Sequence, residues 1–457
     1  MQHSLPVVAT SPRWWSGGYR FILLNLLVTS IAVLSIYLAP QQALAVTSLF
    51  CLLILSLWRL ELALAFQVSG FILVGFSWGS LGFAGYTLAL LFAIIGCGYG
   101  VHLYRFGARL KKGFIPTAVA LVFALMLVGF LYTPAPGPAL EKIAMYVILN
   151  VALFGIVILG KDLKLLLRLL WAIAGFGLVL AVASYIDILF FRDALTSRYA
   201  FGADNPIWFS RSMGLTAILL LSLSRNVRNQ GYHLFKWVIV VCLLYLMIVS
   251  GSRGPMLSLI VTVVIFLLWS NRRRSVVRQA TYIGVFIAAV LLLQSMLPET
   301  VITGRLTTVG QGGPDISLIQ RIREWQLAVE LFRQHPLTGV GTAGFLHHQF
   351  RYPHNIFLEF AAEHGIAGLA LLLGMLAAVV RYCWRLRVAL RGNERAMIIY
   401  RSFTLILIYA FLNAQVSGSI TGNSWLWLGM GGIWALVSYL HYYAPPSPQQ
   451  TSSSGTT

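Results

Sequence analysis

The sequence predicts an all-α polytopic membrane protein with about 12–14 transmembrane helices, and three observations support this class. The chain is 58% hydrophobic, only 10% of its residues are charged, and its mean hydropathy is +0.81. Soluble domains contain about 25% charged residues, so this composition excludes an ordinary soluble domain. Apolar runs of about 20 residues, each long enough to cross the hydrocarbon core as a helix, recur along most of the chain.

Each apolar run is expected to form a helix, because backbone groups in lipid must find their hydrogen-bond partners within the same segment. The expected helices span residues 21–39, 42–57, 62–79, 81–104, 115–133, 144–160, 169–191, 207–224, 234–250, 254–270, 279–297, 364–384, 396–416 and 424–443. Several are short, so re-entrant or interfacial segments remain an alternative to complete spans. The first run lacks a small-residue cleavage site and is expected to be retained.

The distribution of lysine and arginine predicts the orientation of the chain. When the N-terminus is placed in the cytoplasm, about two thirds of the 33 lysine and arginine residues fall in cytoplasmic loops. Both termini are then cytoplasmic, and the stretch 298–363 lies outside, which is the periplasm in a bacterium with an inner and an outer membrane. The net charge of +20 is explained by this bias and requires no nucleic acid partner.

This orientation divides the chain into four expected parts. They are transmembrane helices in 1–297, a large periplasmic loop with amphipathic helices and the candidate catalytic motif in 298–363, transmembrane helices in 364–443, and a disordered cytoplasmic tail in 444–457. The four cysteines fall in expected spans without CxxC spacing, so we expect them to pack in the interior and to form neither disulfides nor a metal site. The expected location is the inner membrane.

Basic residues on the external side run against the charge bias and occur in distinctive short segments. Lys142 ends the turn TPAPGPALEK, Arg211 lies in DNPIWFSRSMG at membrane-surface depth, and Arg253 lies in the small-residue turn SGSRGP. Arg321 precedes Trp325 by one helical turn in SLIQRIREW, so both share a helix face. The planar fork of arginine matches phosphate, so the set suits a phosphorylated lipid. Snorkelling to the interface is the alternative for each residue alone.

The stretch RYPHNIFLEFAAEHGIAG gathers polar groups beside an apolar run. Asn355, Glu359 and Glu363 recur every fourth residue and therefore share one helix face, with His354 about 100° away in the first turn. A neutral imidazole can take a proton from a hydroxyl, and the glutamates can orient a partner or pair with the arginines. A helix cap with solvated acids is the alternative.

A second histidine pair, His347 and His348, precedes this stretch. Together with a glutamate the pair resembles a set of metal ligands, but the HExxH spacing of a helical zinc site does not occur. We therefore expect no metal site.

Two adjacent motifs carry a family resemblance: HPLTGVGTAGF at 335–345 and HNIFLEFAAEHGIAGL at 354–369. Together with Arg321 and Trp325, the SGSRGP turn and the turn ending in Lys142, they resemble the O-antigen ligase and O-antigen polymerase superfamily. The member they resemble most is the lipopolysaccharide O-antigen ligase. The resemblance covers roughly residues 120–440.

The resemblance implies a membrane glycosyltransferase of the GT-C type that needs no metal and no cofactor. Its donor would be a glycan on undecaprenyl pyrophosphate, presented at the periplasmic face, and in-line displacement would invert the anomeric centre. By position, His354 would be the general base, and arginines would hold the pyrophosphate. The substrate-binding residues would be Arg211, Arg253, Arg321, Lys142, Asn355, Glu359 and Glu363. Lys142 is the weaker candidate, because its turn is richer in proline than the family's usual turn.

The acceptor distinguishes the alternative functions. The leading prediction is an O-antigen ligase that moves O-antigen to lipid A–core, because the long external segment lies late in the chain. An O-antigen or exopolysaccharide polymerase, whose acceptor is another lipid-linked unit, and a protein O-oligosaccharyltransferase remain open. A solute transporter is less favoured, because few polar residues, mainly Asp187 and Arg401, lie within the expected spans.

Overall fold

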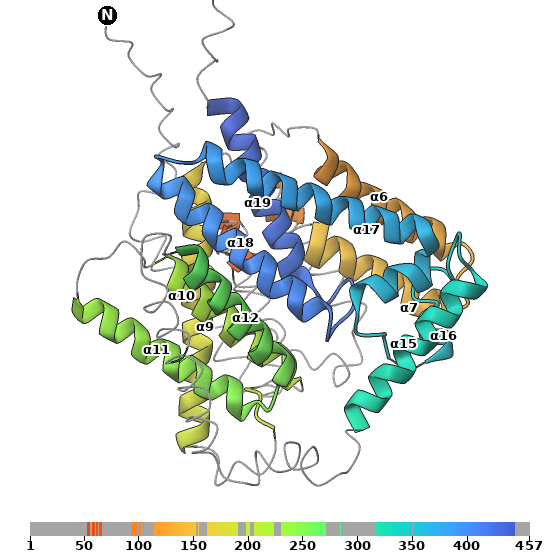
Figure 1. Ribbon diagram of the computed structural model, residues 1–457, viewed down its shortest axis with the longest axis horizontal. Helices are drawn as coiled ribbons and strands as arrows, with labels where there is room; N and C mark the ends of the chain where they lie inside the picture. The colour runs from red at the N-terminus through yellow and green to blue at the C-terminus, as the bar shows by residue number, and fades with distance from the viewer. Residues whose placement is uncertain are drawn as a thin grey trace, which may run out of the picture.

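The computed structural model shows a bundle of long helices (Figure 1). It describes residues 113–151, 162–190, 198–201, 205–223, 230–270, 316–349 and 351–443, together with scattered positions between 53 and 104 and residues 154 and 284. The expected spans at 21–39 and 279–297 and the tail 444–457 lie outside the described residues, apart from residue 284.

The described part of the chain is helical and contains no strand, which confirms the all-α class. Its elements are α6 (Phe114–Phe130), α7 (Pro136–Met145), the π-helical turn η1 (Tyr146–Val151), α9 (Leu163–Phe190), α10 (Pro206–Leu223), α11 (Gln230–Val249), α12 (Arg253–Ser270), α15 (Ile316–Gln334), α16 (Phe345–His348), α17 (Ile356–Ala389), α18 (Glu394–Ala414) and α19 (Ser424–Tyr443). Helices α10, α11, α12, α18 and α19 begin within a few residues of the expected spans. Helix α9 begins earlier than expected.

Local sequence explains several of these boundaries. Asn393 precedes α18 and its side chain accepts a hydrogen bond from Ala396 N, which satisfies one of the unpaired donors of the first turn. Asn205 does the same for α10 by accepting from Ile207 N at 3.0 Å. Proline opens α7 and α10, where its missing N–H costs nothing because the first-turn donors have no helical partner.

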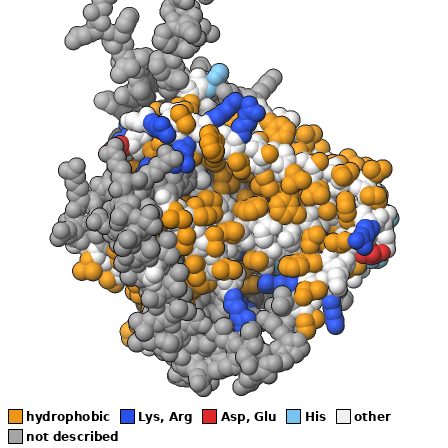
Figure 2. All heavy atoms as spheres, in the orientation of Figure 1, with side chains coloured by type: hydrophobic (Ala, Val, Ile, Leu, Met, Phe, Trp, Pro, Cys, Tyr) orange, Lys and Arg blue, Asp and Glu red, His pale blue; other side chains and the backbone are white. Residues whose placement is uncertain are grey.

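The protein is a multi-pass membrane protein by length and composition of its helices. Among the described residues, α9, α10, α17 and α18 are long and apolar enough to cross a bilayer, and α6 and parts of α11 and α12 are shorter apolar helices. Hydrophobic side chains form a broad surface over α17 and α6, with lysine and arginine gathered above and below it (Figure 2). Such a surface fits a hydrocarbon core between two polar interfaces.

The interior centres on α18, which packs against α10, α12 and α19. Large rings fill the space between these helices, including Trp427, Trp434, Tyr409 and Phe403, all of which are buried. Glycines in α19 and α10 allow the close approach, as expected where lipid gives no hydrophobic force and helices associate by tight packing.

Helix α17 bends at Gly365, which has a φ of 62°. The bend separates a short first limb, 356–364, from the long limb that follows. We expected the span to begin at residue 364, and the bend lies at that boundary, because the non-helical backbone of Gly365 separates two helical segments. The N-terminal ends of α10, α12, α17 and α19 lie near the C-terminal end of α18. The N-terminal ends of α9 and α18 lie at the opposite end of the bundle.

Candidate active site

The run 336–341 caps the bend of α17. Val340 N donates to Ala362 O at 2.9 Å, and Gly341 N donates to Glu363 O at 3.0 Å, so these N–H groups satisfy carbonyls that the bend releases from the helix. In return, Ile366 N donates to Pro336 O at 2.8 Å. Gly339 has a φ of 68° and lies against the backbone of Glu363, where a side chain would not fit. The spacing of proline and glycines therefore serves this backbone contact.

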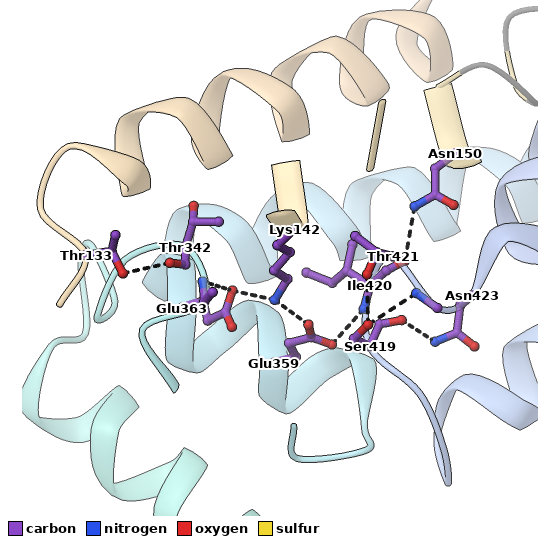
Figure 3. Close-up of polar contacts among 12 residues, drawn as sticks. Thr133, Lys142, Asn150, Thr342, Glu359, Glu363, Ser419, Ile420, Thr421 and Asn423 are labelled. Atoms are coloured by element: carbon purple, nitrogen blue, oxygen red, sulfur yellow. Dashed lines mark hydrogen bonds and ion pairs between the residues drawn. The ribbon is translucent and has the colours of Figure 1, made fainter. Parts of the chain in front are cut away.

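Lys142 of α7 lies between Glu359 and Glu363 in the protein interior (Figure 3). Its Nζ lies 2.5 Å from Glu359 Oε1 and 2.7 Å from Glu363 Oε2, and all three side chains are buried. The aromatic ring of Tyr352 covers the ammonium group, with its centroid 4.6 Å from Nζ. This geometry confirms that Glu359 and Glu363 share a helix face.

The charges in this cluster are matched to one another. Burial alone lowers the pKa of Lys142, but Glu359 and Glu363 outweigh it and raise the pKa above its ordinary value, so the ammonium stays charged. Glu359 also accepts from Ile420 N at 2.8 Å, and Glu363 accepts from Ala343 N at 3.0 Å. The three residues expected to bind substrate are thus engaged with the protein itself and do not face an open surface.

Asn355 is the N-cap of α17, which was the alternative interpretation of this residue. Its Oδ1 accepts from Phe357 N at 3.0 Å and Leu358 N at 3.2 Å. Its Nδ2 donates to Oε1 and the carbonyl of Gln415, at 3.3 and 3.4 Å. Asn355 therefore ties the first turn of α17 to the segment 415–423, which connects α18 to α19 and is called the connector below.

His354 is held in an unusual backbone conformation immediately before this cap. Its φ is 53°, in the left-handed region that a non-glycine residue occupies at a cost of about 1–3 kcal/mol. Trp325 Nε1 of α15 donates to Pro353 O at 2.8 Å, so the residue on each side of His354 is anchored. Strain of this kind persists where the surroundings determine the conformation, and it is common at functional sites.

The connector also determines which nitrogen of His354 carries the proton. Gly418 N donates to Nδ1 at 3.2 Å, so in the neutral ring Nδ1 is the acceptor and the proton lies on Nε2. Burial, followed by the charges of Arg321, Arg351 and Arg211, lowers the pKa of His354 to about 4. The ring is neutral near physiological pH.

Arg211 is buried beneath the connector. Its Nη2 donates to Ser417 O at 2.7 Å and Asn413 O at 3.1 Å, and its Nη1 donates to Gly422 O at 3.5 Å. These carbonyls include the C-terminal end of α18, where the helix dipole is negative. Only 2% of Arg211 is exposed, and a Cβ atom at Gly418 would lie 3.4 Å from Nη1. His354 and Arg211 therefore lie on either side of the same glycine.

Arg253 is exposed at the first position of α12, within the SGSRGP turn. A Cβ atom at the neighbouring Gly254 would lie 3.1 Å from Val416 Cγ2, so this turn also packs against the connector. Arg198 supports the turn by donating to Ser250 O at 3.0 Å and Ser252 Oγ at 2.8 Å.

The connector is the feature that reasoning from sequence missed. It contacts His354, Asn355, Glu359 and Arg211 through its backbone, and Asn150 Nδ2 donates to Ile420 O at 3.3 Å (Figure 3). The available signal was the polar, glycine-containing string QVSGSITGN between two apolar runs. Every residue type has the same backbone carbonyl, and all except proline have the same N–H, so this string did not show which residues the connector would contact.

The described residues contain no group of three or more histidine, cysteine, aspartate or glutamate side chains that could hold a metal. His347 and His348 pack against each other with ring centroids 5.3 Å apart. Cys97, Cys242 and Cys383 are free thiols.

Comparison with known proteins supports the resemblance seen in the motifs. Residues 238–373 match the family model described as O-antigen ligase, and this match contains Arg253, Arg321, His354 and the bend of α17. None of the curated proteins compared with the chain matches it. The family match supports a membrane glycosyltransferase of the ligase or polymerase type. Residues 238–373 of this chain are therefore similar to the O-antigen ligase family.

Proposed function

We propose that the protein transfers a glycan from undecaprenyl pyrophosphate to the lipid A–core of lipopolysaccharide, with His354 as the residue that contacts the acceptor hydroxyl. The observation that carries this proposal is the conformation of His354: a strained, neutral histidine surrounded by Arg321, Arg351 and Arg211. A neutral imidazole can accept a proton from a hydroxyl, and the nearby arginines can stabilise the anion that leaves.

The reaction forms one bond and breaks one bond. The acceptor hydroxyl oxygen bonds to the anomeric carbon as the bond from that carbon to the pyrophosphate oxygen breaks, and its electron pair leaves with the pyrophosphate. Arg321, Arg253 and Arg351 neutralise the developing charge, and Arg211 adds its field from beneath the connector. The hydroxyl proton passes to the imidazole. In-line attack inverts the anomeric centre, and product linkages with retained configuration would contradict it.

The contact between Gly418 and His354 adds a requirement to this mechanism. Nδ1 accepts from Gly418 N, and Nε2 carries the proton, so the ring has no available lone pair in this state. Base catalysis therefore requires the connector to release Nδ1 when substrates bind. A ring that keeps this contact can act only as an Nε2–H donor to the pyrophosphate.

Four of the expected substrate ligands receive a different role in this proposal. Lys142, Glu359 and Glu363 form a buried scaffold that joins α7, α17 and the connector, because their charged atoms pair with one another. Asn355 caps α17 and so positions the adjacent His354. The arginines remain the candidates for the pyrophosphate.

The test uses purified protein with undecaprenyl-pyrophosphate-linked oligosaccharide and EDTA, with and without lipid A–core. We expect wild type to move glycan onto lipid A–core and His354→Ala to lose about a thousandfold or more in rate. His347→Ala is the matched control, because His347 is an exposed histidine of α16, and it should keep full activity. His354→Gln keeps an N–H donor, so its activity should match that of His354→Ala if His354 is the base.

The same tubes separate the related activities. A ladder of longer lipid-linked chains without lipid A–core would replace the ligase with a polymerase that uses the same donor. Full activity of His354→Ala would remove His354 from the mechanism. No transfer to either lipid would direct the search to protein acceptors.

A further inference from the structure

A cavity of about 720 Å³ lies at the end of the bundle opposite His354. It is formed by the first turns of α9, the start of α18 and the four residues Trp58, Arg59, Glu61 and Leu62. Its lining residues are Trp58, Arg59, Glu61, Leu62, Lys164, Leu167, Arg168, Trp171, Ala172 and Arg395. Helix α18 begins at this cavity and ends at the connector, so its 21 residues separate the two sites by about 30 Å.

The cavity has an excess of positive charge. Four cations and one carboxylate line it, which leaves three positive charges. The carboxylate of Glu61 is buried, and it lies 3.5 Å from Arg59 Nη1 and 4.0 Å from Arg168 Nη1. Glu61 therefore orients two arginines while neutralising only one of them. Within the described part of the chain, Lys164 and Arg395 have no carboxylate within 4.0 Å.

The apolar side chains of the cavity indicate that its anion is part of a membrane lipid. Trp58 is 43% exposed and Trp171 is 41% exposed, and Leu62 and Leu167 line the cavity between the charged groups. Tryptophan with an exposed ring beside basic residues is typical of the membrane–water interface. Trp171 and Leu167 lie on α9, one of the helices long enough to span a bilayer.

We propose that this cavity binds the phosphate group of an anionic phospholipid, with the acyl chains lying against Trp58, Trp171 and the adjacent apolar surface. Lys164 and Arg395 contact the phosphate, and Arg59 and Arg168 add the surrounding charge. A basic pocket between membrane helices favours such a headgroup electrostatically, and each cation near the surface adds to the attraction. This site is separate from His354 and does not depend on the function proposed there.

The experiment adds phosphatidylglycerol or phosphatidylcholine to delipidated full-length protein in detergent and counts retained lipids by native mass spectrometry. We expect wild type to retain phosphatidylglycerol about tenfold more than phosphatidylcholine. The double substitution Lys164→Gln and Arg395→Gln should abolish that preference. Arg391→Gln is the control, because it removes one positive charge near the same end of the bundle. Arg391 is exposed in the turn before α18 and does not line the cavity.

Each other outcome overturns part of the proposal. Equal retention of the two lipids by wild type, or the same loss in Arg391→Gln, would show that general surface charge binds the lipid. Thermal stabilisation by inorganic phosphate alone, equal to that by phosphatidylglycerol and lost in the double variant, would keep the anion site but replace the lipid by a free anion. Melting temperatures within about 2 °C of wild type will show that the variants are folded.

Discussion

At the scale of single residues, the structure shows contacts for the candidate side chains that the sequence pattern did not reveal. His354 and Arg211 contact the connector directly, and Arg253 belongs to a turn that packs against it. Lys142 instead forms ion pairs with both Glu359 and Glu363 in the interior. A carboxylate on a helix face is compatible with either role, and only the position of the opposing lysine distinguishes them.

The first prediction concerns the pH dependence set by His354. Its pKa is lowered to about 4 in the native protein, so the native ring stays neutral where a free histidine, with a pKa near 6.5, is already protonated. We expect the transfer rate to be constant between about pH 5.5 and about pH 7.5 and to fall only as pH approaches about 4. An acid limb near pH 6.5 in wild type would contradict the environment described for this histidine.

Removing a neighbouring charge tests the cause of this shift. Arg321→Gln removes the largest charge effect on His354 and should move the acid limb upward. Arg323→Gln is the matched control, because Arg323 is exposed on the same helix and does not contribute to the lowered pKa. The free energy of unfolding should also fall on acidification. The unfolded state binds more protons between about pH 4 and about pH 6.5, so acidification through this window destabilises the native state.

The second prediction concerns the buried ion pairs. Lys142→Met leaves two carboxylates in the interior without their cation and should destabilise the protein by about 3–5 kcal/mol. Adding Glu359→Gln and Glu363→Gln to Lys142→Met should restore part of this loss, because the remaining groups are then neutral. Thermal unfolding in detergent measures both effects. Arg385→Met, an exposed change of α17, should have little effect, and a Lys142→Met protein as stable as wild type would contradict the scaffold role.

At the scale of elements, α17 consists of two helical segments that are separated by the bend at Gly365. The limb 356–364 carries the buried carboxylates, and the limb after Gly365 is long and apolar. The loop 336–344 makes this possible because it caps the bend and also contacts the end of α6: Thr342 N donates to Gly129 O at 3.2 Å and Thr342 Oγ1 to Met126 O at 2.7 Å. The candidate site is therefore supported by contacts between segments that are distant in sequence.

The third prediction tests this loop. Gly339→Ala places a Cβ atom against the backbone of Glu363 at a φ of 68°, and should cost about 2 kcal/mol or more and lower the transfer rate. Gly137→Ala is the matched control, because its Cβ atom would meet nothing within 4 Å in α7. Thermal unfolding and the transfer assay, run on both variants, provide the comparison. Equal effects of the two substitutions would show that the contact at Gly339 is unimportant.

At the scale of the whole molecule, the bundle has two chemically different ends. One carries His354, the connector and the SGSRGP turn, and the other carries the cationic cavity at the starts of α9 and α18. Hydrophobic side chains lie between the two groups of charged residues (Figure 2). Under the function proposed above, the pyrophosphate of the donor binds at the end that carries His354.

The fourth prediction concerns which end faces the cytoplasm. In a protein whose four native cysteines are replaced by serine, Arg323→Cys on α15 should react with a membrane-impermeant maleimide added to the outside of cells with a permeabilised outer membrane. Arg391→Cys, in the turn between α17 and α18, should react only after the inner membrane is opened. Labelling with the reverse pattern would invert the topology and move the candidate site to the cytoplasmic face.

The sequence by itself determined the helical membrane class, the approximate bounds of most of the described helices and the resemblance to the O-antigen ligase superfamily. These properties follow from local quantities, namely hydropathy over about 20 residues and short motifs with fixed spacing. It also identified His354 as a candidate base, because the motif around it is contiguous in the chain.

Only the tertiary structure decided how the site is assembled. The Lys142 contacts bridge residues more than 200 positions apart, and the connector acts on His354 and Glu359 through backbone N–H groups that every residue except proline possesses. The tautomer of His354 depends on one such group, Gly418 N. Residue types and spacing carry no information about such contacts, because they depend on where the folded helices bring distant loops together.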